Sequence, residues 1–159
     1  MTRGRHPSDA RAFLAEAERA TNAFDAEACA AVYANNATLT SITDGARESF
    51  RGAREIAWAW RVYTRVLERI GLQLQKRLIV AAEDVVTNSW AGTSRAGREA
   101  CGFEEWHFDK EARVIEHSMW SSLSIAAPTD PSFAIRSLVT QPRAAIAFLR
   151  ARLAVARVR

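Results

Sequence analysis

Residues 99–123 read EACGFEEWHFDKEARVIEHSMWSSL, with polar and apolar side chains alternating on both sides of a polar turn at 109–112. Alternation with a period of two is typical of half-buried strands, and a short polar connection between two such runs indicates an antiparallel hairpin. We therefore predict one strand over 100–108 and a second over 113–122.

The register of this hairpin decides which side chains meet. If Lys110 and Glu111 are the two central turn residues, Glu104 lies directly opposite His117. Directly opposed residues share a face of the sheet and have Cβ atoms about 5 Å apart. The sequence therefore predicts a contact between a carboxylate and an imidazole, two groups that carry out acid and base chemistry.

The two faces of the hairpin differ in polarity. One face is apolar apart from a few polar side chains, and it comprises Glu104, Trp106, Phe108, Ile115, His117, Met119 and Ser121. The other face comprises Glu105, His107, Asp109, Glu116 and Ser118, together with Phe103, Val114 and Trp120. We expect the first face to be buried.

Capping residues and periodicity place the other elements. Ser8 or Asp9 can begin a helix that ends near Asn22, and Asp25 can begin a short helix over 26–34. Apolar side chains spaced by three and four predict a long amphipathic helix over 53–70. Further strands are predicted over 37–42, 72–83 and 85–95. This order predicts an α+β domain over 8–127 with helices on one face of a sheet, followed by a helical extension over 128–159.

The composition, 48% hydrophobic and 25% charged, is that of an ordinary globular protein. No apolar run approaches the roughly 18 residues that a membrane span needs, and the N-terminus lacks the apolar core of a secretory signal. We therefore expect no membrane association and a cytoplasmic location. Cys29 and Cys101 do not have the spacing of a disulfide framework or a zinc site.

The net charge of +4 comes from the end of the chain. Residues 131–159 contain six arginines and no acid, whereas residues 1–130 contain 16 basic and 18 acidic residues. In a helix over 143–159 the five arginines after Arg136 lie on opposite sides, whereas membrane-binding and nucleic-acid-binding helices usually gather them on one face. The segment therefore suits a helix between two surfaces, and we do not expect nucleic-acid binding.

Four short motifs resemble the nuclear transport factor 2-like superfamily, which includes ketosteroid isomerase-like and SnoaL-like polyketide cyclase families. The motifs are FDAE at 24–27, VYANNAT at 32–38, FRGAREI at 50–56, and WHFD at 106–109 followed by RVI at 113–115. The resemblance covers roughly residues 10–125. It implies a cone-shaped α+β fold in which a curved antiparallel sheet wraps around three N-terminal helices. It also implies a pocket at the open end of the cone and a homodimer formed through the sheet.

The resemblance further implies roles for individual positions. The general base of ketosteroid isomerase-like members falls on Ser41 and their oxyanion-stabilising tyrosine on Ala17, so both groups are replaced here. Their protonated acid falls on Glu104, whereas a supporting tyrosine is kept as Tyr33 and an aromatic residue of the long helix falls on Trp60. Steroid isomerisation by the familiar mechanism is therefore not expected.

The pair of Glu104 and His117 has two interpretations. The carboxylate could orient the imidazole and raise its pKa, which would leave a catalytic acid or base poised near neutral pH. Alternatively, the two side chains satisfy each other in a structural pair without turnover. One inward histidine and one inward acid are too few for a metal site, which typically takes three protein ligands, so we expect neither metal nor cofactor.

Aromatic side chains predict a site for a small, largely apolar molecule. The candidate ligand-binding residues are Tyr33, Ser41, Trp60, Tyr63, Trp90, Trp106, Phe108 and Met119. For any single aromatic residue, core packing is the simpler interpretation, and Ser41 could donate to a ligand carbonyl or simply end a strand.

Two functions follow from these residues. The first is a cofactor-independent lyase, cyclase, dehydratase or isomerase that uses His117 and Glu104 as catalytic residues. The second is a non-catalytic module that binds a small ligand or a partner protein, because the base and the tyrosine of the family are absent. An open cavity reaching a nitrogen of His117 favours the enzyme, and a closed, filled cone favours the binding module.

Overall fold

The structure is a computed structural model that describes residues 9–125 together with Ile135, Val139, Pro142, Arg143, Ile146, Ala147 and Arg150. The chain divides into two compact units, Met1–Ile125 and Ala126–Arg159. In the second unit the described residues are helical. The rest of the predicted helix over 143–159 lies outside the described residues.

The first two helices begin at aspartates, as predicted. The Asp9 carboxylate accepts two backbone N–H bonds, of 2.9 and 3.0 Å, and begins α1, Ala10–Asn22. The Asp25 carboxylate accepts one N–H bond of 2.9 Å and begins α2, Ala26–Ala31. The predicted helix over 26–34 is therefore three residues too long, because Tyr33 already belongs to a strand.

That strand, β1, spans Tyr33–Thr43 and is longer than the predicted 37–42. It pairs antiparallel with β2, Ala46–Arg51, and parallel with the last strand of the domain. The parallel pairing shifts between Tyr33 and Thr38, so the residues between them form an irregularity within the strand. Tyr33 consequently projects from the sheet into the core and is fully buried.

The long helix α3, Gly52–Ile70, agrees with the prediction over 53–70. Its buried face carries Ile56, Ala59, Trp60 and Thr64, at the spacing of one helical side. Gly71 ends the helix in the left-handed conformation, with φ of 62°, and its N–H bonds back to carbonyls of the last turn.

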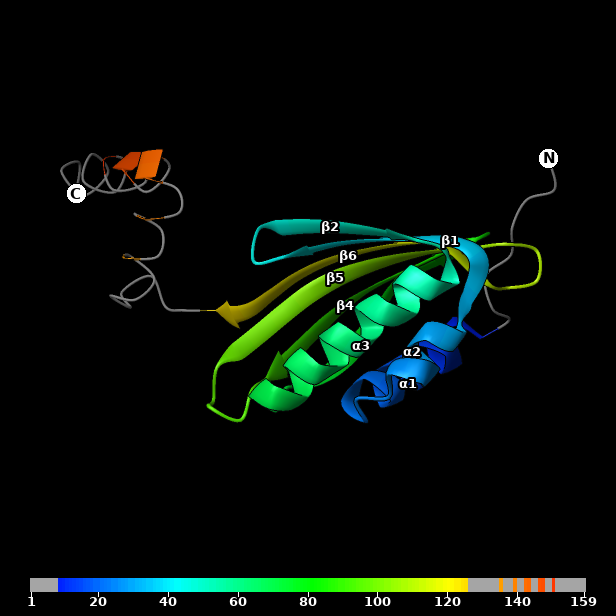
Figure 1. Cartoon of the computed structure of the whole chain (residues 1–159), viewed down its shortest axis with the longest axis horizontal. Helices are drawn as coiled ribbons and strands as arrows, with labels where there is room; N and C mark the ends of the chain where they lie inside the picture. The colour runs from blue at the N-terminus through cyan, green and yellow to red at the C-terminus, as the bar shows by residue number, and fades with distance from the viewer. Residues whose placement is uncertain are drawn as a thin grey trace. The chain divides into compact units, whose positions relative to one another are not determined.

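Four consecutive antiparallel strands complete the sheet. They are β3, Gln73–Ala82, β4, Val85–Thr93, β5, Glu99–Phe108, and β6, Val114–Ile125. The six strands lie in the order β2-β1-β6-β5-β4-β3, so the sheet is mixed and does not close. Its strands curve, and all three helices lie on one side of it (Figure 1). The α+β class and the curved sheet against the N-terminal helices are confirmed.

The core between the helices and the sheet forms two clusters. The larger contains Trp106 and Phe108, whose rings meet Phe13 of α1 edge-on at centroid distances of 5.3 and 5.2 Å. The smaller is built on Trp90 with Leu72, Leu74 and Ala100. A Cβ at Gly102 would lie 2.4 Å from the Trp90 ring, so glycine is what allows this ring to lie on β5.

The register of the β5–β6 hairpin differs from the predicted one. Trp106 lies opposite His117, and Glu104 lies opposite Met119 rather than His117. The connection is longer than two residues, because the Asp109 carboxylate accepts the N–H groups of Glu111 and Arg113 and organises a wider turn.

A bulge next to this turn accounts for the rest of the difference. Phe108 pairs with Val114 and His107 with Glu116, which leaves Ile115 as the extra residue. Ile115 was expected on the buried face, but it is exposed and Val114 is buried in its place. Beyond the bulge, the observed pairing differs from the predicted pairing by two residues. Because this number is even, the residues predicted on the inner face of both strands remain on that face.

Among the described residues, no helix is long and apolar enough to cross a membrane.

Candidate functional site

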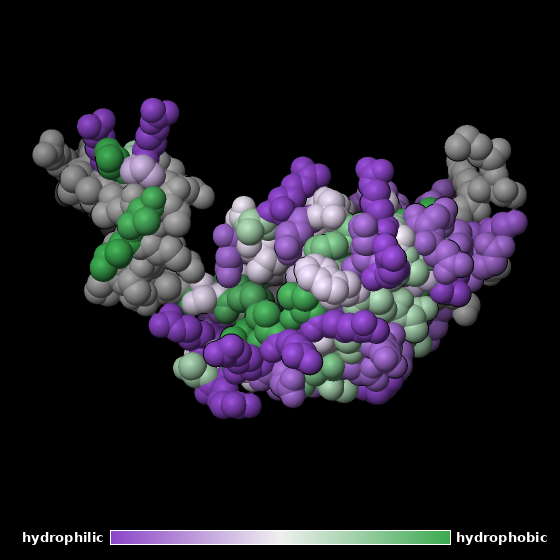
Figure 2. Space-filling view, in the orientation of Figure 1, coloured by the Kyte–Doolittle hydropathy of each residue, from purple (hydrophilic) through white to green (hydrophobic). Residues whose placement is uncertain are grey.

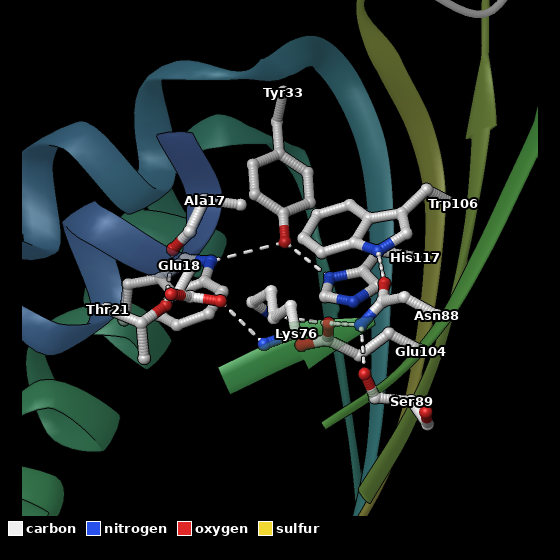
Figure 3. Close-up of polar contacts among 11 residues, drawn as sticks. Ala17, Glu18, Thr21, Tyr33, Lys76, Asn88, Ser89, Glu104, Trp106 and His117 are labelled. Carbon is white, nitrogen blue, oxygen red and sulfur yellow. Dashed lines mark hydrogen bonds and ion pairs between the residues drawn. The ribbon is translucent and has the colours of Figure 1, made fainter. Parts of the chain in front are cut away.

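Polar side chains converge on the inner face of the sheet, which the helices cover (Figure 3). They form two groups of hydrogen-bonded residues. We call Lys76, Glu104 and Asn88 the carboxylate group, and His117, Tyr33 and Trp60 the imidazole group. The rings of Trp106 and His117 join the two groups, because they stack with centroids 3.5 Å apart and an interplanar angle of 12°.

The carboxylate group is a buried ion pair with an amide attached. Lys76 Nζ contacts Glu104 Oε2, and the two side chains are only 2% and 3% exposed. Asn88 Nδ2 donates to the same oxygen at 2.7 Å, and Asn88 Oδ1 accepts from Trp106 Nε1 at 2.9 Å. Burial of a charge is costly unless it is paired and hydrogen-bonded, and here both conditions are met for Glu104.

The imidazole group has a defined direction of hydrogen bonding. Trp60 Nε1 can only donate, and it lies 3.2 Å from Tyr33 Oη, so this oxygen accepts. The Tyr33 hydroxyl then donates its own hydrogen to His117 Nδ1, at 2.6 Å. Neutral His117 therefore carries its hydrogen on Nε2. His117 Nε2 is buried and has no hydrogen-bond partner among the described residues.

Burial keeps both members of this hydrogen bond uncharged. Burial, and then the positive charge of Lys76, holds the pKa of His117 well below its usual value of 6.5. Burial raises the pKa of Tyr33 well above its usual value of 10.0. At neutral pH the site therefore contains a neutral imidazole whose Nε2–H group is free to donate.

This arrangement corrects the predicted pair of Glu104 and His117. The carboxylate is bound by Lys76 and Asn88, and the imidazole by Tyr33, so the two predicted partners do not bond to each other. The rise in the pKa of His117 that the catalytic interpretation of the pair implied is also wrong in direction, since burial, and then the positive charge of Lys76, lowers this pKa. Glu104 remains on the same face as His117, one diagonal position away.

The other predicted site residues lie at different distances from this centre. Trp60, Trp106 and Phe108 belong to the same core cluster as Tyr33, whereas Trp90 belongs to the second cluster. Met119 is buried opposite Glu104.

Two hydroxyl-bearing candidates lie toward the β1–β2 side. Ser41 Oγ lies 3.1 Å from Thr43 Oγ1 and is buried. Tyr63 is half-buried, and its hydroxyl donates to Glu48 at 3.3 Å. Burial raises the pKa of Tyr63 to about 12.

Lys76 and Asn88 were missed by the sequence analysis. The sequence contained a signal for both, because every second residue of a strand lies on the same face. On β3 this places Lys76 between Leu74 and Leu78, and on β4 it places Asn88 between Val86 and Trp90. A lysine or an asparagine between inward apolar neighbours predicts a buried polar group that needs a partner. The partner itself follows only from strand pairing, which places Asn88 opposite Glu104.

The described residues contain no group of three or more His, Cys, Asp or Glu side chains that could hold a metal ion. The absence of a metal or cofactor stays a prediction. A groove of about 480 Å³ lies outside the cone, between α3 and the start of α2, and none of the candidate residues lines it.

No family model and no curated protein matches the chain, but solved structures do. A steroid delta-isomerase from Pseudomonas aeruginosa aligns with a TM-score of 0.57 and 17% identity, over 94% of this chain and 97% of its own. A SnoaL-like protein from Burkholderia thailandensis aligns with a TM-score of 0.54 and 26% identity, over 70% and 92%. SalBIII, an epoxide hydrolase/cyclase-like enzyme in pyran ring formation in the polyether salinomycin, aligns with a TM-score of 0.55 and 12% identity, over 72% and 91%.

The shared architecture is an α+β fold whose curved sheet packs on N-terminal helices. The chain thus has the fold of the nuclear transport factor 2-like superfamily, as its motifs predict.

Proposed function

We propose that the cone binds a small, largely apolar molecule that carries an acceptor oxygen such as a carbonyl, and that His117 Nε2–H donates to this oxygen. The observation that carries the proposal is the buried Nε2 without a partner. A buried donor that lacks its hydrogen bond costs about 1–3 kcal/mol, so such groups are rare and call for a specific explanation. A ligand oxygen would satisfy this donor.

The same geometry supports an activity of the isomerase or lyase type. A neutral imidazole that donates a hydrogen bond can stabilise the negative charge that develops on a carbonyl oxygen during enolisation. Glu104, on the same face and about 7 Å away at the diagonal position, pairs with Lys76 and is the acid side chain placed to exchange a proton with carbon. The C–H electron pair then forms the enolate double bond, and the carbonyl π pair moves to the oxygen that His117 binds. In a ketone with a β,γ double bond, return of the proton at the γ-carbon restores the carbonyl and gives the conjugated isomer.

A matched pair of ring compounds tests the binding step. With ¹⁵N-labelled histidine, cyclohexanone should shift the His117 Nε2–H resonance, whereas cyclohexane, which has the same ring without the oxygen, should not. Enolisation should appear as deuterium uptake at the carbons next to the carbonyl in D₂O. His117→Phe should abolish both signals, and His107→Phe, on the outer face, should preserve them. Equal responses to the ketone and the hydrocarbon would refute the role of His117.

The second candidate is a binding module without turnover. The filled core favours it, because Tyr33, Leu39, Ile56, Trp106 and Phe108 are all less than 3% exposed. The replacement of the family's base by Ser41 and of its tyrosine by Ala17 points the same way. Ketone binding without any deuterium uptake would identify this module.

We also infer that two copies of the chain associate through the outer face of the sheet. Phe103 and Trp120 pair across β5 and β6 with ring centroids 5.9 Å apart, and Trp120 is 42% exposed there. Trp120→Glu should convert a dimer to a monomer in sedimentation experiments, whereas the same change at the exposed Trp58 of α3 should not. A wild-type chain that sediments as a monomer would refute the inference.

A further inference from the structure

An exposed apolar surface lies on α3, on the side that faces away from the sheet. Trp58 is 56% exposed, and Val62 and Val66 follow at intervals of four residues with partial exposure. Residues four apart lie on one side of a helix, so we call these three residues the α3 ridge. Apolar side chains gather over the C-terminal half of α3 and are bordered by hydrophilic ones (Figure 2).

The groove of about 480 Å³ runs beside this ridge. Trp58 and Val62 form one wall, and Phe24, next to the start of α2, contributes to the other. Phe24 adopts φ of 56°, in the left-handed region that a bulky residue rarely occupies. The local backbone thus holds an aromatic side chain at the groove in spite of conformational strain.

The charges at the groove are unbalanced. Arg61 and Arg65 line it, against a single acid, Glu68. Both arginines are exposed, and within residues 9–125 neither guanidinium makes an ion pair or a hydrogen bond. The groove therefore combines an exposed tryptophan with two free cations, and its charge complements an acidic occupant.

We propose that this groove binds an acidic amphipathic helical segment of a partner protein. The apolar side chains of this segment pack on Trp58 and Val62, and its carboxylates pair with Arg61 and Arg65. The lining residues of α3 run from Trp58 to Glu68, a rise of about 15 Å, which matches roughly three turns of a bound helix. Tryptophan and arginine are among the residue types enriched at the positions that dominate binding energy.

The charge argument also disfavours the chain's own C-terminal segment as the occupant. Residues 131–159 carry six arginines and no acid, so their charge repeats that of the groove instead of complementing it. The proposal is independent of the His117 site, because no residue of the carboxylate or imidazole group lines the groove.

Selection of a displayed library of random 14-residue peptides on the full chain tests the proposal. Enriched peptides should combine Asp or Glu with apolar residues spaced by three and four, and one such peptide, fluorescently labelled, serves as the probe. In fluorescence anisotropy, Arg61→Glu combined with Arg65→Glu should weaken its binding at least tenfold, and Trp58→Ala should do the same. A peptide with lysine in place of its acids should prefer the doubly reversed variant.

Arg54→Glu is the matched control, because Arg54 is an exposed arginine of α3 that does not line the groove. It should change affinity less than twofold, and circular dichroism should show every variant folded. Enrichment of no peptides, or of peptides that bind the groove variants as tightly as the wild type, would overturn the proposal. Displacement of the probe by a peptide of residues 143–159 would assign the groove to the chain's own segment. Concentration-dependent association that Trp58→Ala abolishes would assign it to a second copy, and either result would also overturn the proposal.

Discussion

Each face of β5 carries a glutamate that pairs with a basic side chain, and the two pairs lie in opposite environments. On the inner face, Glu104 pairs with Lys76 and both side chains are almost completely buried. On the outer face, Glu105 pairs with His107 at 2.9 Å, and the side chains are 39% and 31% exposed. Of these two adjacent glutamates, Glu104 thus lies in the protein interior and Glu105 at the solvent-exposed surface.

The two pairs differ mainly in how much stability the fold loses when one partner is removed. Water and salt weaken an exposed pair, so the median contribution of such a pair to stability is about 0–1 kcal/mol. A buried pair contributes little relative to an apolar core, but removing one partner leaves an uncompensated charge and costs about 3–5 kcal/mol. Removal of only one partner of the inner pair should therefore destabilise the fold strongly.

Loss of the inner cation should give the largest effect. We expect Lys76→Met to lower the free energy of unfolding by about 3–5 kcal/mol, because Glu104 then stays buried without its counter-charge. Denaturant unfolding measures this change, and adding Glu104→Gln should restore most of the stability. Lys110→Met is the matched control, since Lys110 forms an exposed pair with Glu111. A loss below about 1 kcal/mol would show that the inner pair behaves like a surface pair.

Loss of the tyrosine hydroxyl should have the next largest effect. Tyr33→Phe removes the donor to His117 Nδ1 and the acceptor of Trp60 Nε1–H, which should cost about 1–3 kcal/mol. In ¹⁵N spectra, His117 should also lose its single tautomer. Tyr63→Phe, which removes a half-buried hydroxyl, should cost less and leave that tautomer in place. An unchanged His117 spectrum in Tyr33→Phe would contradict the assigned direction of bonding.

Acid should destabilise the fold through the inner histidine. The pKa of His117 is lowered in the folded chain, so below about pH 6.5 the unfolded chain binds a proton that the folded chain does not. Stability should therefore fall with decreasing pH, by at most about 1.4 kcal/mol per unit for this one group. Unfolding measured in steps between about pH 7 and pH 5 should show a shallower dependence in His117→Phe than in His107→Phe. Equal slopes in the two variants would exclude His117 as the source.

Loss of the outer pair should have the smallest effect. We expect Glu105→Gln to change the free energy of unfolding by less than about 1 kcal/mol, and salt should reduce this change further. Thermal unfolding at low and high salt measures it. A loss comparable to that of Lys76→Met would mean that the outer face is covered, as in the proposed dimer.

Much of the architecture is predictable from local signals along the chain. Asp9 and Asp25 mark helix starts, the apolar spacing over 53–70 marks α3, and alternation marks the strands and their inner faces. These signals are local because a cap, a turn of helix or a strand face depends on residues a few positions apart. The inward placement of Glu104 and His117 follows from them as well.

The hydrogen-bond partners of the inward polar residues, in contrast, lie far from them in the sequence. Two bonds to Asp109 widen the turn and one bulged residue, Ile115, shifts the register, so Trp106 rather than Glu104 lies opposite His117. Tyr33 was also predicted to lie within a helix over 26–34, whereas its pairing with β6 makes it the first residue of a strand.

Local chemistry along the sequence thus determined the order of the elements, the fold class and the side of the sheet to which most of the residues point. The tertiary structure decided that Glu104 is bound by Lys76, and His117 by Tyr33, 84 positions away in the chain. The physical reason is that a buried polar group needs a partner at hydrogen-bonding distance. Which group arrives there is set by strand register and helix packing, and small irregularities far from the site can change both.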